Sequence, residues 1–583
     1  MPDCPFNPAA ENIADLIYRF GSLQSERWNN TSSLCADYVS SDYIILHMPL
    51  TPDAVSMRVH PYYMIPSLFS PLDYNAMEAS GILSAFNSPA LNNQGKGVLI
   101  GLVDTGIDYR SPLFQNPDGT TRIAGIWDQS VPIEEDVLPA GVPDYYPMGG
   151  SSYGTEYTRE QINEALASDD PLSLVPTQDT IGHGTFLAGL AAGSSIPQED
   201  FTGAAPEAEL AVVKLKPAKK YLRDFYLIPS DAPAFQENDI MMGIKYLRMM
   251  ADRLKKPLVI LLAMGSNSGS HIGTYPLSQV TQNYSGFFGI ITVIACGNET
   301  GAAHHFYASI PAGTEYEDVE IRVGKEEAER GFVLELWAAD ADTYTVGFIS
   351  PSGERISRIP IIANNETSIP FLLDATTITV NYQLIEAESG SQLIFMRFQT
   401  PAAGIWTVRV YNTQRFKGTF HMWLPVQGMI SEETVFLRPD PYSTITVPGN
   451  SRLPITVGAY DTSTGGIYIH SSRGFTPNQI VKPELAAPGV NILGPSVGRK
   501  PGSDTPMTTR TGTSAAAAIT AGAAANLLGW GIVEGNYPTM SEASVKSYLI
   551  RGAQRNPALT YPNREYGYGT LDLHEAFLHL RNL

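Results

Sequence analysis

The amino-acid sequence predicts an α/β protein built on a parallel sheet, with a small α+β module before it and an antiparallel β-sandwich inserted into it. The parallel sheet is predicted because short apolar runs alternate with helical patterns, and several of these runs end in a polar residue beside a glycine. The insertion is predicted because helical periodicity almost disappears between about 315 and 429. Short runs rich in Val, Ile, Tyr, Phe and Thr, separated by turns, replace it there.

Length and composition narrow the possible functions. With 583 residues the chain is long enough for two to four domains, and 43% hydrophobic with 17% charged residues is an ordinary globular composition. A formal net charge of −21 argues against a nucleic-acid partner, because phosphate binding needs a basic surface. There is no uninterrupted run of 18 apolar residues, so no membrane span is expected.

The first residues, MPDCPFNPAAENI, contain no basic and apolar stretch of the kind that directs secretion, so we expect synthesis in the cytoplasm. Cys4, Cys35 and Cys296 have neither metal-binding spacing nor the spacing of a disulfide framework. We therefore expect three buried or incidental thiols and no metal ligands.

Residues 1–75 form the opening module. Apolar residues at helical spacing predict a helix over 11–20, and the apolar run at 42–48 predicts a strand. Prolines at positions 61, 66 and 71 predict an extended exit from this module.

The run Val98–Val103 predicts a buried strand that ends at Asp104-Thr105-Gly106. A carboxylate at the carboxyl end of a central strand faces the crevice where α/β proteins place their chemistry. Gly95-Lys96-Gly97 precedes its strand, which excludes a dinucleotide loop. An aspartic protease would need a second Asp-Thr/Ser-Gly triplet, and the sequence has none.

Further elements follow in order. A Thr158-x-x-Gln161 capping box begins a short helix, and His183, between two glycines, begins a helix that runs to about Ala192. The remaining predicted strands are 210–215, 257–264, 287–295, 453–459 and 482–488, and the remaining predicted helices are 239–254, 515–528, 543–551 (after a Thr539-x-x-Glu542 capping box) and 573–580.

Four residues of this pattern predict one catalytic site. Asp104 and Asn298 follow strands, whereas His183 and Ser514 begin helices, so all four are expected at one edge of the sheet. Alone, Ser514 would be interpreted as a helix N-cap. When the four residues are considered together, Ser514 is predicted to be a nucleophile and His183 its general base. Asp104 would orient the imidazole, and Asn298 would donate to an oxyanion.

The motifs Asp104-Thr105-Gly106, Gly182-His183-Gly184-Thr185, Cys296-Gly297-Asn298 and Gly512-Thr513-Ser514, in this order, resemble the subtilisin-type serine proteases. The resemblance covers roughly 76–312 and 433–583. It implies a subtilisin-like three-layer core with a catalytic domain in two parts (76–312 and 433–583), a prodomain (1–75) and an inserted jelly-roll-like domain (313–432). It also implies substrate-binding positions at Ala263, Met264, Gly265 and Gly297.

Within that family the sequence is most similar to the Csp group of clostridial spore-germination proteases. The supporting features are Ile126-Trp127-Asp128-Gln129, Gly154-Thr155-Glu156-Tyr157 and the inserted β domain. The resemblance implies an autoprocessed prodomain that can stay bound, incorporation into the spore, and the zymogen of a spore-cortex lytic hydrolase as substrate. Pseudoprotease relatives are possible partners. No cofactor or catalytic metal is expected, and a structural calcium ion is left open.

The chain departs from the family at two positions near the site. Ala515-Ala516-Ala517-Ala518 lacks the usual proline after the serine, and Phe186 replaces a second histidine. Two alternatives to an activating protease remain. One is a signalling or scaffold protein with a silent or occluded site, as in the group's pseudoproteases, and the other is a general degradative subtilase. The distance to Asp104 predicts autocleavage between Pro66 and Met77.

Overall fold

The computed structural model describes residues 6–19, 35–40, 42–51, 56–71, 78–86, 93–132, 153–196, 201–339, 341–362, 366–498 and 506–581. Its centre is an eight-stranded sheet in which every pair is parallel except the edge pair β6–β7. In spatial order its strands are β25 (Leu485–Pro488), β24 (Ile455–Tyr460), β12 (Ile290–Ala295), β10 (Leu258–Leu262), β5 (Leu99–Asp104), β8 (Glu209–Lys214), β6 (Ile123–Asp128) and β7 (Thr155–Thr158).

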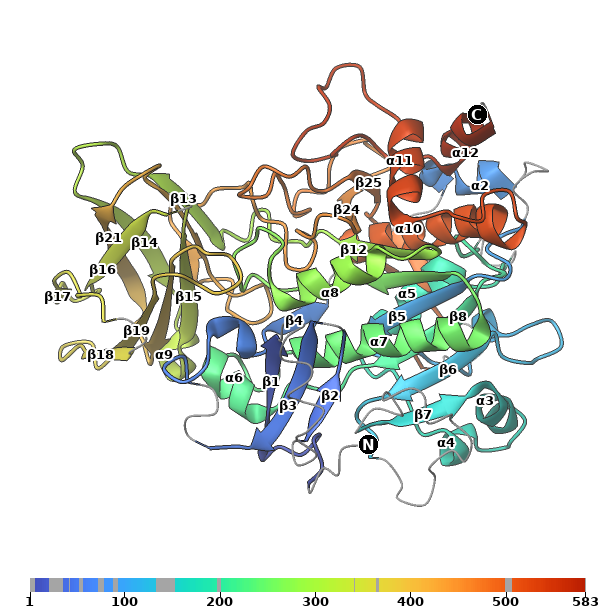
Figure 1. Ribbon diagram of the computed structural model, residues 1–583, viewed down its shortest axis with the longest axis horizontal. Helices are drawn as coiled ribbons and strands as arrows, with labels where there is room; N and C mark the ends of the chain where they lie inside the picture. Colours follow the sequence, from blue (N-terminus) through green and yellow to red (C-terminus); the bar gives the residue numbers. More distant parts are fainter. Residues whose placement is uncertain are drawn as a thin grey trace.

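Helices cover both faces of this sheet, which makes the core three-layered (Figure 1). Side chains alternate along β5: Ile100 and Leu102 pack in one apolar cluster, whereas Leu99 and Val103 pack in the other. The first cluster is covered by α2 (Ile82–Phe86), α3 (Arg159–Leu166), α5 (His183–Ala192), α10 (Thr513–Leu528), α11 (Glu542–Gly552) and α12 (Leu573–Arg581), and the second by α6 (Lys220–Tyr226), α7 (Glu237–Leu254) and α8 (Pro276–Ser285).

The remaining short elements lie between the longer ones along the chain. They are η1 (Tyr62–Met64), η2 (Glu78–Ser80), η3 (Pro112–Phe114), α4 (Pro171–Leu174), α9 (Glu327–Arg330) and η5 (Gly529–Val533), with the hairpin β26 (Ile492–Pro495) and β27 (Met507–Arg510).

Between β12 and β24 the chain forms two antiparallel sheets around a shared apolar core, as the change of texture predicts. Figure 1 shows them as a lobe at one end of the molecule. In spatial order the six-stranded sheet contains β13 (His305–Ser309), β22 (Thr419–Trp423), β15 (Phe332–Ala338), β20 (Leu393–Gln399), β19 (Thr377–Gln383) and β18 (Glu366–Pro370). The five-stranded sheet contains β17 (Arg355–Ile356), β16 (Thr343–Ile349), β21 (Gly404–Gln414), β14 (Tyr316–Val323) and β23 (Val435–Phe436).

The N-terminal segment differs from the sequence prediction at one element. The predicted helix over 11–20 is wrong: β1 (Ile13–Arg19) is a strand that pairs with β3 (Tyr43–Pro49), and β2 (Ala36–Tyr38) completes a three-stranded sheet. Its first five residues are all buried, because both faces of β1 are covered. Apolar residues at helical spacing cannot be distinguished from such a two-sided strand without knowledge of its partners.

Two further predictions are corrected. The N-cap of α11 is Ser541, whose backbone N–H donates to Ser544 Oγ at 2.8 Å, and not Thr539. Glu542 is buried and accepts a hydrogen bond from the backbone N–H of Thr292 at 2.6 Å.

Cys35 is disulfide-bonded, contrary to the expectation of a thiol, whereas Cys296 is free and buried. The capping box at Thr158 and Gln161 is confirmed.

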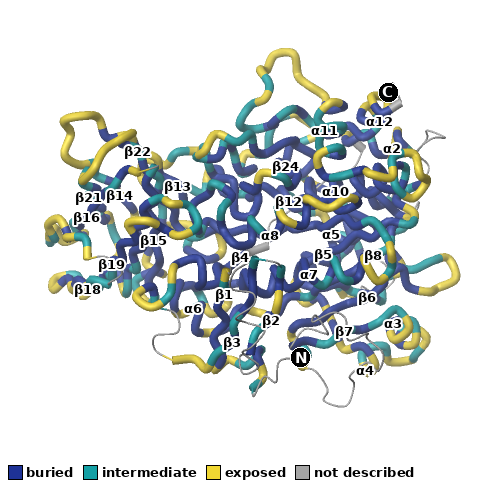
Figure 2. Tube along the Cα trace, viewed as in Figure 1, coloured by how far each residue is buried: buried dark blue, intermediate teal, exposed yellow. Residues whose placement is uncertain are grey.

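The helix α10 together with η5 is long and apolar enough to cross a membrane, the only helix in the described ranges for which this holds. However, 83% of the apolar window is buried inside the protein. Figure 2 shows this segment among other buried chain segments. A core helix passes the same test, and its burial is sufficient to explain its composition.

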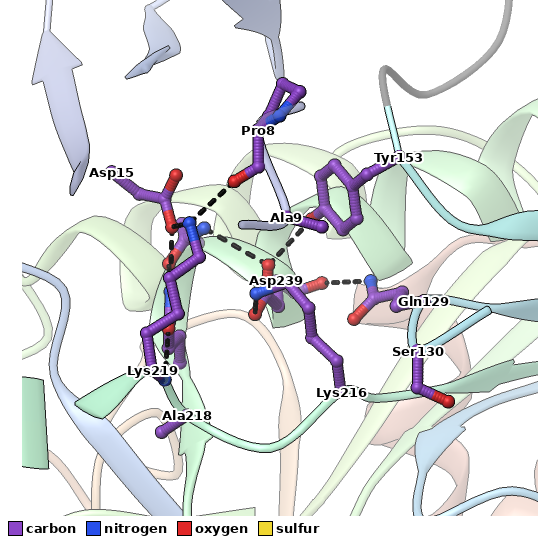
Figure 3. Close-up of polar contacts among 12 residues, drawn as sticks. Pro8, Ala9, Asp15, Gln129, Ser130, Tyr153, Lys216, Ala218, Lys219 and Asp239 are labelled. Atoms are coloured by element: carbon purple, nitrogen blue, oxygen red, sulfur yellow. Dashed lines mark hydrogen bonds and ion pairs between the residues drawn. The ribbon is translucent and has the colours of Figure 1, made fainter. Parts of the chain in front are cut away.

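The N-terminal sheet is joined to the layer of α6 and α7 by buried charges (Figure 3). Asp15 on β1 and Lys219, the N-cap of α6, form an ion pair with an Oδ2–Nζ distance of 2.8 Å. Lys219 Nζ also donates to the carbonyl oxygen of Pro8 at 2.6 Å. A second buried pair, Lys216 and Asp239, lies beside the first. Such pairs contribute little net stability, but removing one partner leaves a buried charge unpaired, which costs about 3–5 kcal/mol.

His47 is held between two carboxylates in this interface. Its Nδ1 is 2.8 Å from Asp15 Oδ1 and its Nε2 is 3.2 Å from Asp37 Oδ2, so both nitrogens donate only when the ring is charged. Burial by itself would lower the pKa of His47, but the hydrogen bonds to the two carboxylates outweigh it and raise the pKa to about 9. Burial would likewise raise the pKa of Asp15, yet Lys219 and His47 hold it well below its ordinary value.

We predict that stability decreases at alkaline pH because of His47. The folded-state pKa is raised from 6.5 to about 9, so the contribution is fully present below pH 6.5 and is lost as the pH rises to about 9. The full shift corresponds to about 3 kcal/mol. Thermal unfolding of the full chain between about pH 6 and pH 10 measures the loss. The His47→Gln protein, which has no titratable group at position 47, is the control. The same pH dependence of stability in that protein would contradict the role of His47.

Candidate active site

Two of the predicted residues meet at the carboxyl edge of the central sheet. Asp104 is the last residue of β5 and His183 the first residue of α5, and His183 Nδ1 lies 2.6 Å from Asp104 Oδ1. Both residues are 2% exposed. Because Nδ1 faces a carboxylate, it carries the hydrogen, and Nε2 is the nitrogen that can accept a proton.

Gly184 allows this contact. A Cβ at this position would lie 2.1 Å from the carbonyl oxygen of Gly106, closer than any side chain can approach. The first turn of α5 therefore packs directly on the loop that follows Asp104. The Gly-His-Gly pattern of the sequence has its physical reason here.

Asp179 connects the same two segments. Its Oδ1 accepts from Thr105 Oγ1 at 2.8 Å and from the backbone N–H of Gly182 at 2.7 Å, while its Oδ2 accepts from the backbone N–H and the hydroxyl of Thr185 at 2.9 and 2.8 Å. The carboxylate thus joins the residue after Asp104 to the first turn of the His183 helix. Sequence reasoning missed this role, although an Asp four residues before His183 is a recognisable turn and capping signal.

Ser514 lies at the N-terminal turn of α10 and is fully buried. Its Oγ is 3.5 Å from the carbonyl oxygen of Ala263, which follows β10. The helix packs against α5, β10 and β12, so Ser514 comes to the sheet edge that carries Asp104 and His183. Backbone N–H groups at a helix N-terminus give the surroundings of its hydroxyl a positive potential.

Asn298 contacts Thr513, the residue before Ser514. The backbone N–H of Thr513 donates to Asn298 Oδ1 at 3.1 Å, and the backbone N–H of Gly297 donates to Thr513 Oγ1 at 3.3 Å. Because a backbone N–H can only donate, this contact assigns the amide: Oδ1 faces Thr513 and Nδ2 points the other way. Gly297 has φ +104°, and a Cβ there would meet Thr446 Cγ2 at 2.7 Å, so glycine is required.

A buried carboxylate anchors the loop that carries Asn298. Glu299 accepts from Asn267 Nδ2 at 3.0 Å and from the backbone N–H of Gln427 at 3.1 Å, and its Oε2 is 2.9 Å from His304 Nδ1. Gln427 Nε2 also donates to the carbonyl oxygen of Asn298 at 3.2 Å. The segment after β22 therefore supports the site directly, which no local sequence pattern indicates.

Two of the four predicted substrate-binding positions, Met264 and Gly265, pair with a strand of the protein's own chain. Residues of β4 (Leu68–Pro71) form the middle strand of a three-stranded antiparallel sheet between β11 (Met264–Gly265) and β9 (Phe235–Gln236). Pro71 is paired with Met264 and Ser70 with Gly265, whereas Phe69 is paired with Phe235. A strand held on both sides in this way is how an extended peptide binds by strand addition.

Among the described residues, no group of three or more His, Cys, Asp and Glu side chains is arranged to hold a metal ion. The buried polar groups of the site bond to one another instead, as the Asp104–His183 and Asp179 contacts show.

Comparison with known proteins identifies the family. The profile of the subtilase family, Peptidase S8, matches residues 95–349 and 438–569, more than half of the chain. The chain belongs to the subtilase family. The unmatched residues between the two blocks lie within the two antiparallel sheets that separate β12 from β24.

Solved and curated subtilases support this placement. The CspB protease of Clostridium perfringens is 30% identical and superposes with a TM-score of 0.74, over 86% of this chain and 97% of that one. The subtilisin-like proteases SBT3.5 and SBT3.12 of Arabidopsis thaliana are 23% and 24% identical over 87% and 81% of this chain. The chain spans 64% and 59% of the lengths of these two plant subtilases.

We predict that Asp179→Ala disturbs the position of Asp104 relative to His183 in this subtilase. Losing the carboxylate frees the loop after Asp104 and the first turn of α5, and a displacement of about 1 Å at such a site costs about 100-fold in rate. The rate at which a fluorophosphonate labels Ser514 measures the loss, and thermal unfolding shows whether the variant is folded. Asp179→Asn, which keeps an acceptor, should lose less. Equal labelling of the wild type and a folded Asp179→Ala protein would contradict this role.

Proposed function

We propose that the chain is a serine endopeptidase in which Ser514 is the nucleophile, His183 the general base and Asp104 the residue that orients the imidazole. Ser514 Oγ attacks the peptide carbonyl carbon while its proton passes to His183 Nε2. The C–N bond then breaks, that proton moves to the leaving amine, and a water molecule repeats the two steps to release the acyl group. The observation that carries the proposal is the 2.6 Å contact between His183 Nδ1 and Asp104 Oδ1, at the sheet edge where α10 begins.

Asn298 and the backbone N–H of Ser514 would stabilise the tetrahedral oxyanion. With Asn298 Oδ1 engaged by the backbone N–H of Thr513, Nδ2 is the group left to donate to the substrate oxygen. One such donor contributes about 2.7–4 kcal/mol to the transition state. A donor fixed by a neighbouring backbone contact needs no reorganisation during the reaction.

The first substrate of this enzyme, in our proposal, is its own N-terminal segment. Residues 1–75 would be a prodomain and 313–432 an inserted jelly-roll-like domain, and β4 would be the tail of the prodomain held as a substrate is held. The register of β4 with β11 ends with Pro71 opposite Met264, and the residue next to Met264 toward β10 is Ala263. We therefore propose cleavage after Leu72, inside the predicted interval from Pro66 to Met77, of which residues 72–77 lie outside the described part of the chain.

The similarity to CspB supports a narrower role. We propose that the enzyme is made in the cytoplasm, is incorporated into the spore and activates the zymogen of a spore-cortex lytic hydrolase during germination, without a cofactor. A second candidate is a scaffold or signalling protein whose site stays occluded. It is favoured by the pairing of β4 with both β9 and β11, because β4 occupies the facing edges of these two strands.

Autoprocessing separates these two candidates. We predict that the wild type loses an N-terminal piece and that Ser514→Ala remains full length, since Ser514 Oγ is the attacking atom. A gel shows the processing, and mass spectrometry of the released piece should find Leu72 at its end. A full-length wild type that cleaves no protein would exclude the endopeptidase. An intact peptide that spans Pro66 to Met77 in active protein would exclude the proposed cleavage site.

Activity should decrease in acid because the base must be neutral. We predict that the processing rate falls in acid, because a protonated His183 cannot accept the proton of Ser514. The measurement is the initial rate of N-terminal release between about pH 4 and pH 8. A rate that stays flat down to about pH 4 would contradict the role of His183 as general base.

A further inference from the structure

The residue just before β4 is held by three hydrogen bonds. Ser67 is fully buried. Its backbone N–H donates to Glu237 Oε2 at 3.1 Å, its carbonyl oxygen accepts from the backbone N–H of Glu237 at 2.9 Å, and its Oγ donates to the hydroxyl of Tyr275 at 2.8 Å. Glu237 and Tyr275 both come from elements that flank the cleft. Ser67 is therefore held by the walls of the cleft, as the residues of β4 are.

Glu237 binds the main chain at this position. It is the first residue of α7 and follows directly after β9, the strand that pairs with Leu68 and Phe69. Its side chain is fully buried, and its second oxygen accepts from the backbone N–H of Leu277 at 2.9 Å. Glu237 thus continues the pairing of the tail by one residue beyond the end of β9, and any peptide in the cleft would offer it the same backbone groups.

Tyr275 contacts the side chain of Ser67. It is 2% exposed, immediately precedes α8 and has its ring 5.9 Å from that of Tyr62. Since Ser67 is fully enclosed, a larger side chain has no room there, and alanine would leave the buried Tyr275 hydroxyl without this hydrogen bond. The geometry therefore favours a serine.

We propose that Glu237 and Tyr275 form an upstream subsite that selects serine at the sixth residue before the cleaved bond. The inference rests on the proposed function, because it treats the tail as a bound substrate. Leu68 and Phe69 are also buried, at 2% and 0% exposure. The substrate class that fits is an extended segment with a serine followed by two large apolar residues.

The test removes one hydrogen bond from either side. In the Ser514→Ala protein, where no self-cleavage interferes, the readout is chymotrypsin cleavage after Phe69, which is fully buried while the tail lies in the cleft. Cleavage of a segment that opens transiently reports the population of the open form. Tyr275→Phe and Ser67→Ala should each raise the chymotrypsin cleavage rate about 2- to 10-fold, the worth of one neutral hydrogen bond. Combining them should raise it no further, because both remove the same contact.

A buried tyrosine elsewhere is the matched control. The Tyr382 hydroxyl donates to the carbonyl oxygen of Ile359 at 3.2 Å and accepts from the backbone N–H of Val346 at 3.1 Å within the inserted sheets. Tyr382→Phe therefore also loses one buried hydroxyl but should leave the chymotrypsin rate unchanged. An unchanged rate in Tyr275→Phe, or additive effects of the two changes, would overturn the subsite. Either result would leave the proposed protease activity standing.

Selectivity in trans provides a second measurement. The processed wild type is given two peptides with the sequence of residues 65–76, one with serine and one with alanine at the position of Ser67. The ratio of their kcat/KM values should be about 2 to 10 for the wild type and about 1 for Tyr275→Phe. Equal cleavage of the two peptides by the wild type would refute the selectivity. If the wild-type protein cleaves neither peptide nor its own tail, the proposed function is wrong. In that case the chymotrypsin measurement alone tests whether Glu237 and Tyr275 bind Ser67.

Discussion

The structure depends on how closely α10 packs into the middle of the molecule. Every residue from Thr513 to Leu528 is buried, and the helix contacts β10, β12, β24 and α5 together. Only small side chains permit such contact on all sides: at Gly522 a Cβ would lie 2.4 Å from Cβ of Ala204. The alanine run that departs from the usual proline is thus compatible with a close-packed core. This packing brings Ser514, at the start of α10, to Ala263 at the end of β10.

Buried polar contacts join the remaining parts of the chain to this core. Glu335 on β15 accepts from Tyr62 of the N-terminal segment, from the backbone N–H of Gly269 at 3.0 Å and from Trp337 Nε1 at 2.8 Å. Asp15 and Lys219 make a similar junction between β1 and α6. Because a buried carboxyl group without partners costs several kcal/mol, such junctions strongly favour one arrangement of the three parts. The cleft and its occupant are therefore held in register by groups remote from Ser514.

Local patterns predicted that the candidate site residues follow strands or begin helices. The candidate residues each follow a strand or begin a helix: Asp104, His183, Asn298 and Ser514. Because the strands are parallel, such positions lie at one edge of the sheet. Asp179 was within reach of the same reasoning, since it lies in the turn before α5. Glu299, Gln427 and Tyr275 were not, because each acts through a contact with a residue far away in sequence. Such contacts depend on tertiary packing, and single-sequence periodicity does not encode them.

The sequence by itself determined the order of the sheet-forming runs, the two-part core around an inserted β region, and the identity of the catalytic candidates. These follow from apolar periodicity and from glycine and polar residues at strand and helix ends, which act over a few residues. Only the tertiary structure decided that residues 13–19 form a strand, because that strand is stabilised by β3 and by burial of both faces. It also decided that Leu68–Pro71 lies between β9 and β11, since strand pairing depends on partners more than 160 residues away.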